Sequence, residues 1–239
     1  MRTGIILAAG FGSRLAGSHN ETRLKPLTPV AGKPLLIRTL NSLEMAACHN
    51  VIVVVGYGGE EVKKALNEFY SGPLSVDFVF NPHYEKQNGL SLLAAKDHVS
   101  NDFVLTMADH VFSDDIMKLA AVHQPPDEGA TLFVDYNIED VFDLDDATKV
   151  YVDEKERVVR IGKQLEKFNC IDTGLFIGTQ GMIEAGNSLF KEKGDASLSE
   201  IVEALAGKKK MNTKDIKESF WQDVDTPEML AYAEQQLMA

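Results

Sequence analysis

The sequence has few basic residues and little cysteine. Its 239 residues include 24 lysines and arginines against 36 aspartates and glutamates, so the formal net charge at pH 7 is −12. Such a chain lacks the basic surface that gives most non-specific affinity for nucleic acid, and an anionic membrane surface would repel it. The two cysteines, Cys48 and Cys170, are too few for a disulfide framework. We therefore expect no nucleic-acid partner and a reducing, cytoplasmic location.

Long apolar runs are also absent. The run Ile5 to Ala9 is too short for a signal peptide or a membrane span, and no later stretch approaches 18 uncharged apolar residues. We therefore expect no membrane insertion. A hydrophobic content of 44% in a chain of this length is enough for a sizeable core. No linker or repeat is visible, so we expect residues 1–239 to form a single domain with two lobes.

The order of the patterns predicts an α/β fold. In the first part, short β-branched or apolar runs alternate with amphipathic segments, as in βαβ units around a mostly parallel sheet. The elements expected there are strands at 4–9, 51–55, 76–80 and 103–107, with helices after Pro34, at 60–70 and at 90–98. From Ala130 strands dominate, at 131–136, 149–152, 158–161 and 171–177, before helices at 180–190, 198–206 and 227–237. The second part therefore predicts a smaller, β-rich lobe in a mixed sheet.

Positive charge is concentrated at the start of the chain. The first 40 residues have six basic side chains and one acidic one, a net charge of +5 that leaves −17 for the rest. Within this segment, Gly10 to Arg14 directly follows the first predicted strand, where glycines let backbone amides approach a phosphate. The third glycine of a dinucleotide-binding loop is replaced by Leu15, and no P-loop ending occurs. These observations argue against a dehydrogenase and leave a weak phosphate-binding signal.

The surrounding string strengthens that signal. Residues 7–15 read Leu-Ala-Ala-Gly-Phe-Gly-Ser-Arg-Leu, with Lys25-Pro26 ten residues later. This pattern resembles the nucleotidyltransferases that join a nucleoside triphosphate to a sugar or polyol phosphate. The resemblance implies their Rossmann-like three-layer αβα fold, with a nucleotide-binding half at 1–128 and an acceptor-binding half at 129–239. It also implies catalytic roles for Arg14 and Lys25 on the triphosphate, and nucleotide contacts from Leu7, Ala8, Ala9, Gly10, Gly12 and Ser13.

Three aspartates are candidates for a metal site. Asp109 follows the predicted strand 103–107, at the edge of the sheet where ligands bind in open α/β folds. Asp223 and Asp225 alternate, so both face one side if the segment is extended. The resemblance implies that Asp109 and a C-terminal aspartate hold catalytic Mg²⁺. It favours Asp225 over Asp223, although Asp225 or Thr226 could instead cap the helix that begins at Pro227.

The pockets for the base and the acceptor are less clearly marked. Asn88 and Gly89 suit either a helix start or a loop that reads a nucleobase, and the resemblance favours base and ribose contacts from Asn88, Gly89 and Ser91. The same resemblance implies acceptor contacts from Lys149, Lys163 and Asp172. His110, beside Asp109, is expected only to form ordinary hydrogen bonds.

A narrower resemblance covers most of the chain. The strings Ala147-Thr148-Lys149-Val150, Ile161-Gly162-Lys163, Asp172-Thr173-Gly174 and Asp223-Val224-Asp225-Thr226 are similar to those of cytidylyltransferases acting on inositol 1-phosphate. The resemblance implies CTP and inositol 1-phosphate as substrates. In many members the domain is fused to a membrane phosphotransferase that consumes the CDP product. This chain ends at Ala239, so we expect that partner to be a separate protein; a homodimer is also open.

Other interpretations stay open. The acceptor could be phosphocholine or aminoethylphosphonate, because the acidic stretch 135–146 also has Tyr136 and Phe142, and aromatic faces bind ammonium groups. The nucleotide could be UTP or dTTP, with a hexose 1-phosphate as acceptor. A non-catalytic nucleotide-sensing module is the alternative outside enzymes, although the presence of Arg14, Lys25, Asp109 and Asp225 argues against it.

Overall fold

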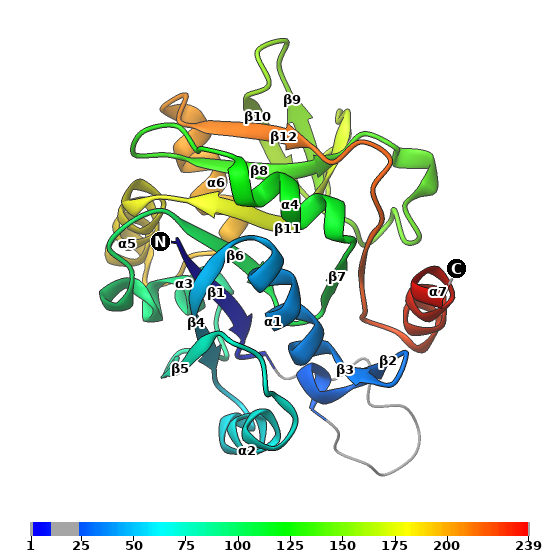
Figure 1. Ribbon diagram of the computed structural model, residues 1–239. Helices are drawn as coiled ribbons and strands as arrows, with labels where there is room; N and C mark the ends of the chain where they lie inside the picture. Colours follow the sequence, from blue (N-terminus) through cyan, green and yellow to red (C-terminus); the bar gives the residue numbers. More distant parts are fainter. Residues whose placement is uncertain (1, 11–23, 239) are drawn as a thin grey trace.

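A computed structural model describes residues 2–10 and 24–238 of the chain. At its centre is a sheet with the strand order β10-β9-β11-β6-β1-β4-β5; in addition, β8 pairs with β11, and β12 pairs with β8 (Figure 1). The strands of this sheet are β1 (Arg2–Ala8), β4 (Cys48–Val55), β5 (Ser75–Phe80), β6 (Phe103–Met107), β8 (Ala130–Asp135), β9 (Lys149–Val152), β10 (Val158–Gly162), β11 (Cys170–Gly178) and β12 (Met211–Asp215).

The four strands of the first half run parallel. β1 pairs with β4 on one side and β6 on the other, and β4 pairs with β5. Their carboxyl ends therefore meet at one edge of the sheet. β11 runs antiparallel to β6, β8 and β9, and this antiparallel part joins the second half of the chain to the same sheet. The sheet is thus mixed, as the sequence predicts.

Helices cover both faces of the sheet. The β-branched run of β4 is buried on both sides: Ile52 and Val54 belong to one core, and Val51, Val53 and Val55 to the other. This alternation follows from the two-residue period of a strand. The first core also contains α3 (Gly89–Ala94), α5 (Gln180–Lys193) and α6 (Leu198–Gly207), and the second contains α1 (Leu35–Met45), α2 (Gly59–Phe69) and α4 (Asp114–Val122). The result is a three-layer αβα arrangement, visible in Figure 1.

Several short elements and the C-terminal helix lie outside these layers. They are η1 (Lys25–Leu27), β2 (Pro29–Val30), β3 (Lys33–Pro34), η2 (Lys96–His98), β7 (His110–Phe112), η3 (Ile138–Asp140), β13 (Trp221–Asp223) and α7 (Pro227–Met238). β13 pairs antiparallel with β7, which places Asp223 opposite His110. The pairing brings the C-terminal segment to the carboxyl ends of β1 and β6.

The predicted long elements agree with the structure within a few residues, but α4, β7, β12 and β13 were not predicted. In the described part of the chain, no helix combines the length and apolar character needed to cross a membrane.

Candidate active site

A cavity of about 780 Å³ opens at the carboxyl ends of β1 and β6 and is lined by residues from both halves of the chain. Ligands of open α/β sheets bind at this edge. Many of the residues predicted from the sequence lie on its walls: Leu7, Ala8, Gly10, Lys25, Asn88, Asp109, Lys163, Asp172, Asp223 and Asp225. The fold thus brings together candidates that are distant in the sequence.

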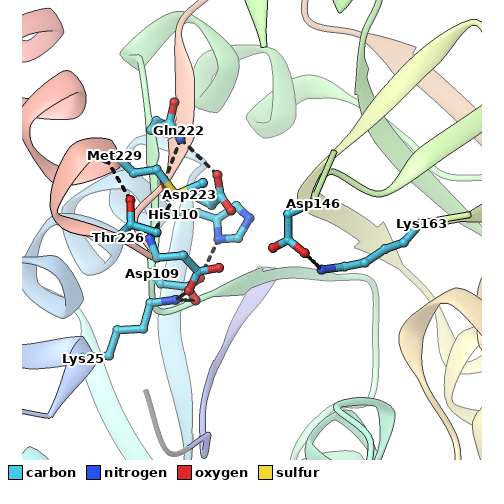
Figure 2. Close-up of polar contacts among 10 residues, drawn as sticks. Lys25, Asp109, His110, Asp146, Lys163, Gln222, Asp223, Thr226 and Met229 are labelled. Carbon is cyan, nitrogen blue, oxygen red and sulfur yellow. Dashed lines mark hydrogen bonds and ion pairs between the residues drawn. The ribbon is translucent and has the colours of Figure 1, made fainter. Parts of the chain in front are cut away.

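The centre of the site is an ion-pair cluster. The Lys25 ammonium donates to the carboxylates of both Asp109 and Asp225 (Figure 2). Lys25 is placed by η1, whose Pro26 is buried, and Asp109 follows β6 directly. The backbone N–H of Val224 donates to the Asp109 carbonyl oxygen at 2.9 Å, which ties the C-terminal segment to this strand end. The Lys25 ammonium is therefore shared by two carboxylates that lie more than 100 residues apart in the sequence.

The start of α7 explains why Asp225 is not the helix cap. The Thr226 hydroxyl accepts a hydrogen bond from the Met229 N–H at 3.3 Å, so Thr226 provides the helix cap. The sequence left open whether Asp225 or Thr226 caps this helix, and the structure shows that Thr226 does. Asp225 points to Lys25 instead.

Burial and neighbouring charges have opposite effects on the pKa values of this cluster. Burial alone lowers the pKa of Lys25, but the neighbouring Asp109 and Asp225 carboxylates outweigh it and raise the pKa. Burial likewise raises the pKa of Asp109, but Lys25 and His110 outweigh it and hold the pKa of this carboxyl well below its ordinary value. The cluster therefore holds ionised groups at neutral pH.

Asp223 is held apart from this shared cation. Its carboxylate accepts a hydrogen bond from the Gln222 side-chain amide at 3.0 Å. Burial raises the pKa of Asp223, and the nearby Asp109 and Asp225 add to the effect, while His110 opposes it. Burial lowers the pKa of His110, but the Asp109 carboxylate outweighs this and raises it. The geometry thus favours Asp225 over Asp223 as the partner of Asp109.

The cluster can be tested as a place for Mg²⁺. In protein sites that bind phosphates, Mg²⁺ is commonly held by one or two carboxylates together with substrate phosphates and water. Across residues 2–10 and 24–238, no three His, Cys, Asp or Glu side chains are grouped as a protein-only metal site. Asp109 and Asp225 nevertheless converge on one cation, and this donor set fits a metal that is completed by a nucleotide.

The opposite wall of the cavity has the acceptor candidates. The Lys163 ammonium donates to the Asp146 carboxylate at 2.5 Å, and Figure 2 shows this pair facing the Asp109 cluster across the cavity. Asp172 accepts a hydrogen bond from the Gly174 N–H at 2.7 Å. Burial raises the pKa of Asp172 to about 6, although that hydrogen bond acts in the other direction. A carboxylate and an ammonium thus face the same space.

Lys149 does not line the cavity. Its ammonium donates to the Lys163 carbonyl oxygen at 3.0 Å and to the Asp145 and Ala147 carbonyl oxygens at 3.4 Å. These bonds hold the segment before β9 against the end of β10. Lys149 therefore stabilises the loop around the acceptor candidates, and its position does not indicate contact with an acceptor.

The base candidates are divided. Asn88 lines the cavity, and its side-chain oxygen accepts from the Leu198 N–H, the first of α6, at 2.9 Å instead of capping its own helix. Gly89 is buried, and a Cβ there would lie 2.5 Å from the Ala196 carbonyl oxygen, so a protein neighbour explains this glycine. The buried Ser91 hydroxyl accepts from the Asn81 amide at 3.0 Å. Only Asn88 of these three borders the cavity.

The remaining candidates are in the first loop. Ala9 is buried and does not line the cavity, and its carbonyl oxygen accepts from the Tyr57 N–H at 3.4 Å. Gly12, Ser13 and Arg14 lie outside the described residues, so their predicted roles stay predictions.

Aromatic residues form part of the wall: Phe142, which the sequence suggested for an ammonium group, and three that it did not single out, Phe220, Trp221 and Tyr232. The rings of Phe142 and Tyr232 have centroids 5.0 Å apart, and Phe220 lies 6.1 Å from Tyr232. The Trp221 indole N–H donates to Asp135 at 2.8 Å. For Trp221 the available signal in the sequence was its position just before Asp223.

Comparison with known proteins agrees with this geometry. The family model for the MobA-like NTP transferase domain matches residues 4–151. A bifunctional IPC transferase and DIPP synthase of Thermococcus kodakarensis is 36% identical over 236 residues, which are 98% of this chain and 50% of that protein. A CMP-5'-(3-aminopropyl)phosphonate synthase of Streptomyces rubellomurinus is 37% identical over 118 residues, 49% of this chain and 18% of that protein.

A solved structure extends the comparison to the fold. The inositol-1-phosphate CTP transferase of T. maritima superimposes with a TM-score of 0.83 at 26% identity, covering 98% of this chain and 97% of that one. The chain spans about half the length of the curated IPC transferases and DIPP synthases that it matches. The sequence match, the Rossmann-like architecture and the site at the sheet edge agree. The chain therefore belongs to the MobA-like NTP transferase domain family of nucleotidyltransferases.

Proposed function

We propose that this protein transfers CMP from CTP to inositol 1-phosphate, giving a CDP-polyol and pyrophosphate, with Mg²⁺ as the metal. The observation that carries the proposal is the convergence of Asp109 and Asp225 on Lys25 at the edge of the nucleotide-binding half. The named activity of the T. maritima structure supports the choice of CTP and inositol 1-phosphate.

The chemistry needs charge neutralisation more than a base. An oxygen of the acceptor phosphate attacks the α-phosphorus of CTP, and the bond from that phosphorus to the oxygen bridging to the β-phosphate breaks. The electron pair leaves with pyrophosphate, so no proton has to be removed from the nucleophile. Fixed positive charges lower the repulsion between the two anions. Lys25 supplies one such charge on the cavity wall, and Arg14 is predicted to supply a second.

Asp109 and Asp225 are the residues that would hold Mg²⁺. When bound there, the metal neutralises charge on the α-phosphate. The Lys25 ammonium then has the triphosphate as an alternative partner to the two carboxylates. The low pKa of Asp109 keeps this carboxyl ionised and ready for a cation throughout the neutral range.

The acceptor would lie against the second half of the chain. Lys163 offers an ammonium that can exchange Asp146 for the acceptor phosphate, since charge-assisted bonds to phosphate and carboxylate are of similar strength. Asp172 offers a carboxylate oxygen to a hydroxyl of the polyol. In this proposal, residues 1–128 bind the nucleotide and residues 129–239 bind the acceptor.

A second acceptor is favoured by a specific observation. Phe142 and Tyr232 form an aromatic wall beside the carboxylates of Asp140 and Asp143, and such a wall suits an alkylammonium group. The Streptomyces relative is named for an aminopropylphosphonate product. An aminoalkyl phosphonate is therefore the second candidate for the same transfer reaction.

Pyrophosphate release tests both candidates. CTP, UTP, dTTP and ATP are each combined with Mg²⁺ and with inositol 1-phosphate, 2-aminoethylphosphonate, phosphocholine or glucose 1-phosphate. We expect CTP with inositol 1-phosphate to give the highest kcat/KM. A higher value with the aminoalkyl phosphonate favours the second candidate, and a preference for UTP or dTTP with glucose 1-phosphate overturns the choice of nucleotide. Nucleotide binding without release for any acceptor favours a sensing module.

A further inference from the structure

The two oxygens of the Asp109 carboxylate have different partners, and His110 binds one of them. Its ring Nδ1 lies 2.5 Å from Asp109 Oδ1, while Oδ2 is the oxygen paired with Lys25 (Figure 2). An ionised carboxylate only accepts hydrogen bonds, so Nδ1 has the proton and donates it. Oδ1 is therefore occupied by the protein, and Oδ2 is the oxygen presented to a cation.

The imidazole is held firmly in this orientation. It lies nearly parallel to Trp221 of β13, with centroids 6.3 Å apart and an interplanar angle of 18°, and to Phe112 of β7 at 6.0 Å and 28°. Gly174 of β11 lies behind Nε2, where a Cβ would be only 2.5 Å from this atom. Gly174 also has a φ of +74°, so glycine is favoured here on two grounds. Three strands thus restrict rotation of the ring.

This arrangement goes beyond ordinary packing of a histidine at a strand end. A ring that only filled space would not need its Nδ1 donor aimed at the carboxylate that faces the cavity. Residues that orient a metal ligand from behind commonly change metal affinity by about 10–100-fold when they are lost. His110 orients Asp109 from behind in this way.

We propose that His110 is a positioning residue, which holds the Asp109 carboxylate so that Oδ2 faces the metal required for nucleotidyl transfer. The inference rests on the proposed metal-dependent function. It assigns His110 no contact with substrate and no proton transfer. Its prediction concerns metal affinity, which can be measured without turnover.

The test compares variants that separate the donor from the ring. His110→Phe keeps a flat ring between Trp221 and Phe112 but removes the donor. His110→Asn loses the ring but places an amide N–H near the position of Nδ1, and His110→Leu is its matched control of similar shape without a donor. Mn²⁺ binding is measured by calorimetry with a non-hydrolysable CTP analogue, and stability by urea unfolding.

We expect His110→Phe to weaken Mn²⁺ binding by about 10-fold or more. We also expect His110→Asn to bind Mn²⁺ more tightly than His110→Leu at similar stability. Wild-type affinity in His110→Phe, or equal affinity in the Asn and Leu variants, overturns the inference. If His110→Phe does not fold, the Asn and Leu pair decides. Failure of the wild-type protein to bind Mn²⁺ or release pyrophosphate overturns the proposed function itself, which separates the two results.

Discussion

The indole N–H of Trp221 donates a hydrogen bond to the carboxylate of Asp135 at 2.8 Å. The bond joins β13 to the end of β8, and both residues line the cavity. Asp135 is only 7% exposed, so few alternative donors can reach it from water. The same indole ring stacks on His110, so this bond also supports the wall behind Asp109.

Trp221→Phe should lower the free energy of unfolding by about 1.5–3 kcal/mol, because hydrogen bonds to charged groups contribute about that much and Asp135 stays buried. In an Asp135→Asn background the acceptor is neutral, and the same change should cost only about 0.5–1.5 kcal/mol. Urea unfolding followed by circular dichroism measures both values. Equal losses in the two backgrounds would show that the hydrogen bond is not the cause.

Asp172 predicts a pH dependence of stability. Burial raises its pKa to about 6 in the folded protein, against an ordinary value of 3.8. Between these two values the folded state binds the proton more tightly than the unfolded chain, so this group makes stability fall as the pH rises. The fall is complete above pH 6, and a shift of about 2 pKa units corresponds to at most about 3 kcal/mol.

Asp172→Asn keeps an acceptor for the Gly174 N–H but does not ionise. Relative to the wild-type protein, it should gain stability as the pH rises from 4 to 7, measured by urea unfolding at each pH. Asp127→Asn is the control, because Asp127 is exposed. A difference between wild type and Asp172→Asn that does not change with pH would contradict the prediction.

Gly89 tests whether packing alone explains a residue predicted to bind the base. An added Cβ would lie 2.5 Å from the Ala196 carbonyl oxygen, so Gly89→Ala should lower the free energy of unfolding by about 1–3 kcal/mol. Gly207→Ala is the matched control, since nothing lies within 4 Å of its Cβ position. It should be neutral or stabilise α6 by up to about 1 kcal/mol. Similar thermal unfolding of the two variants would refute this explanation.

Lys163→Met should act on the acceptor and not on the nucleotide. Loss of one charged contact to phosphate costs about 1.5–3 kcal/mol, so the KM for the acceptor should rise by about 10-fold or more. The KM for CTP should change little, because Lys163 lies opposite the Asp109 cluster. Lys208→Met is the control, since Lys208 is exposed and outside the cavity. Steady-state kinetics in each substrate give the answer, and an equal rise in both KM values would argue against an acceptor role.

The long elements could be predicted because their patterns are local. The apolar runs of β4, β8 and β11 and the alternation of β9 appear in the sequence without reference to any neighbour. β7 and β13 have three residues each, too few for a period to be visible, and they exist because they pair with each other. Those two strands bring Asp223 and His110 together, so this part of the site was beyond sequence reasoning.

The candidate site also has parts that local motifs predict and parts that depend on tertiary neighbours. The motifs around Gly10, Lys25, Asp109 and Asp225 predicted residues that do meet at one cavity. Gly89 and Ser91 look like ligand contacts in the sequence, but their neighbours are Ala196 and Asn81. A glycine that accommodates a base and one that accommodates the chain's own backbone have the same sequence signal, and only the tertiary structure distinguishes them.

Metal-dependent pyrophosphate release by Asp109→Asn tests the central claim most directly. The substitution keeps the shape of the side chain and removes the charge that pairs with Lys25. Assayed with CTP, inositol 1-phosphate and Mg²⁺, the wild-type protein should release pyrophosphate, and Asp109→Asn should lose at least about 100-fold in kcat while its far-UV circular dichroism is unchanged. Wild-type turnover in this variant would contradict the assignment of the cavity as a nucleotidyl-transfer site.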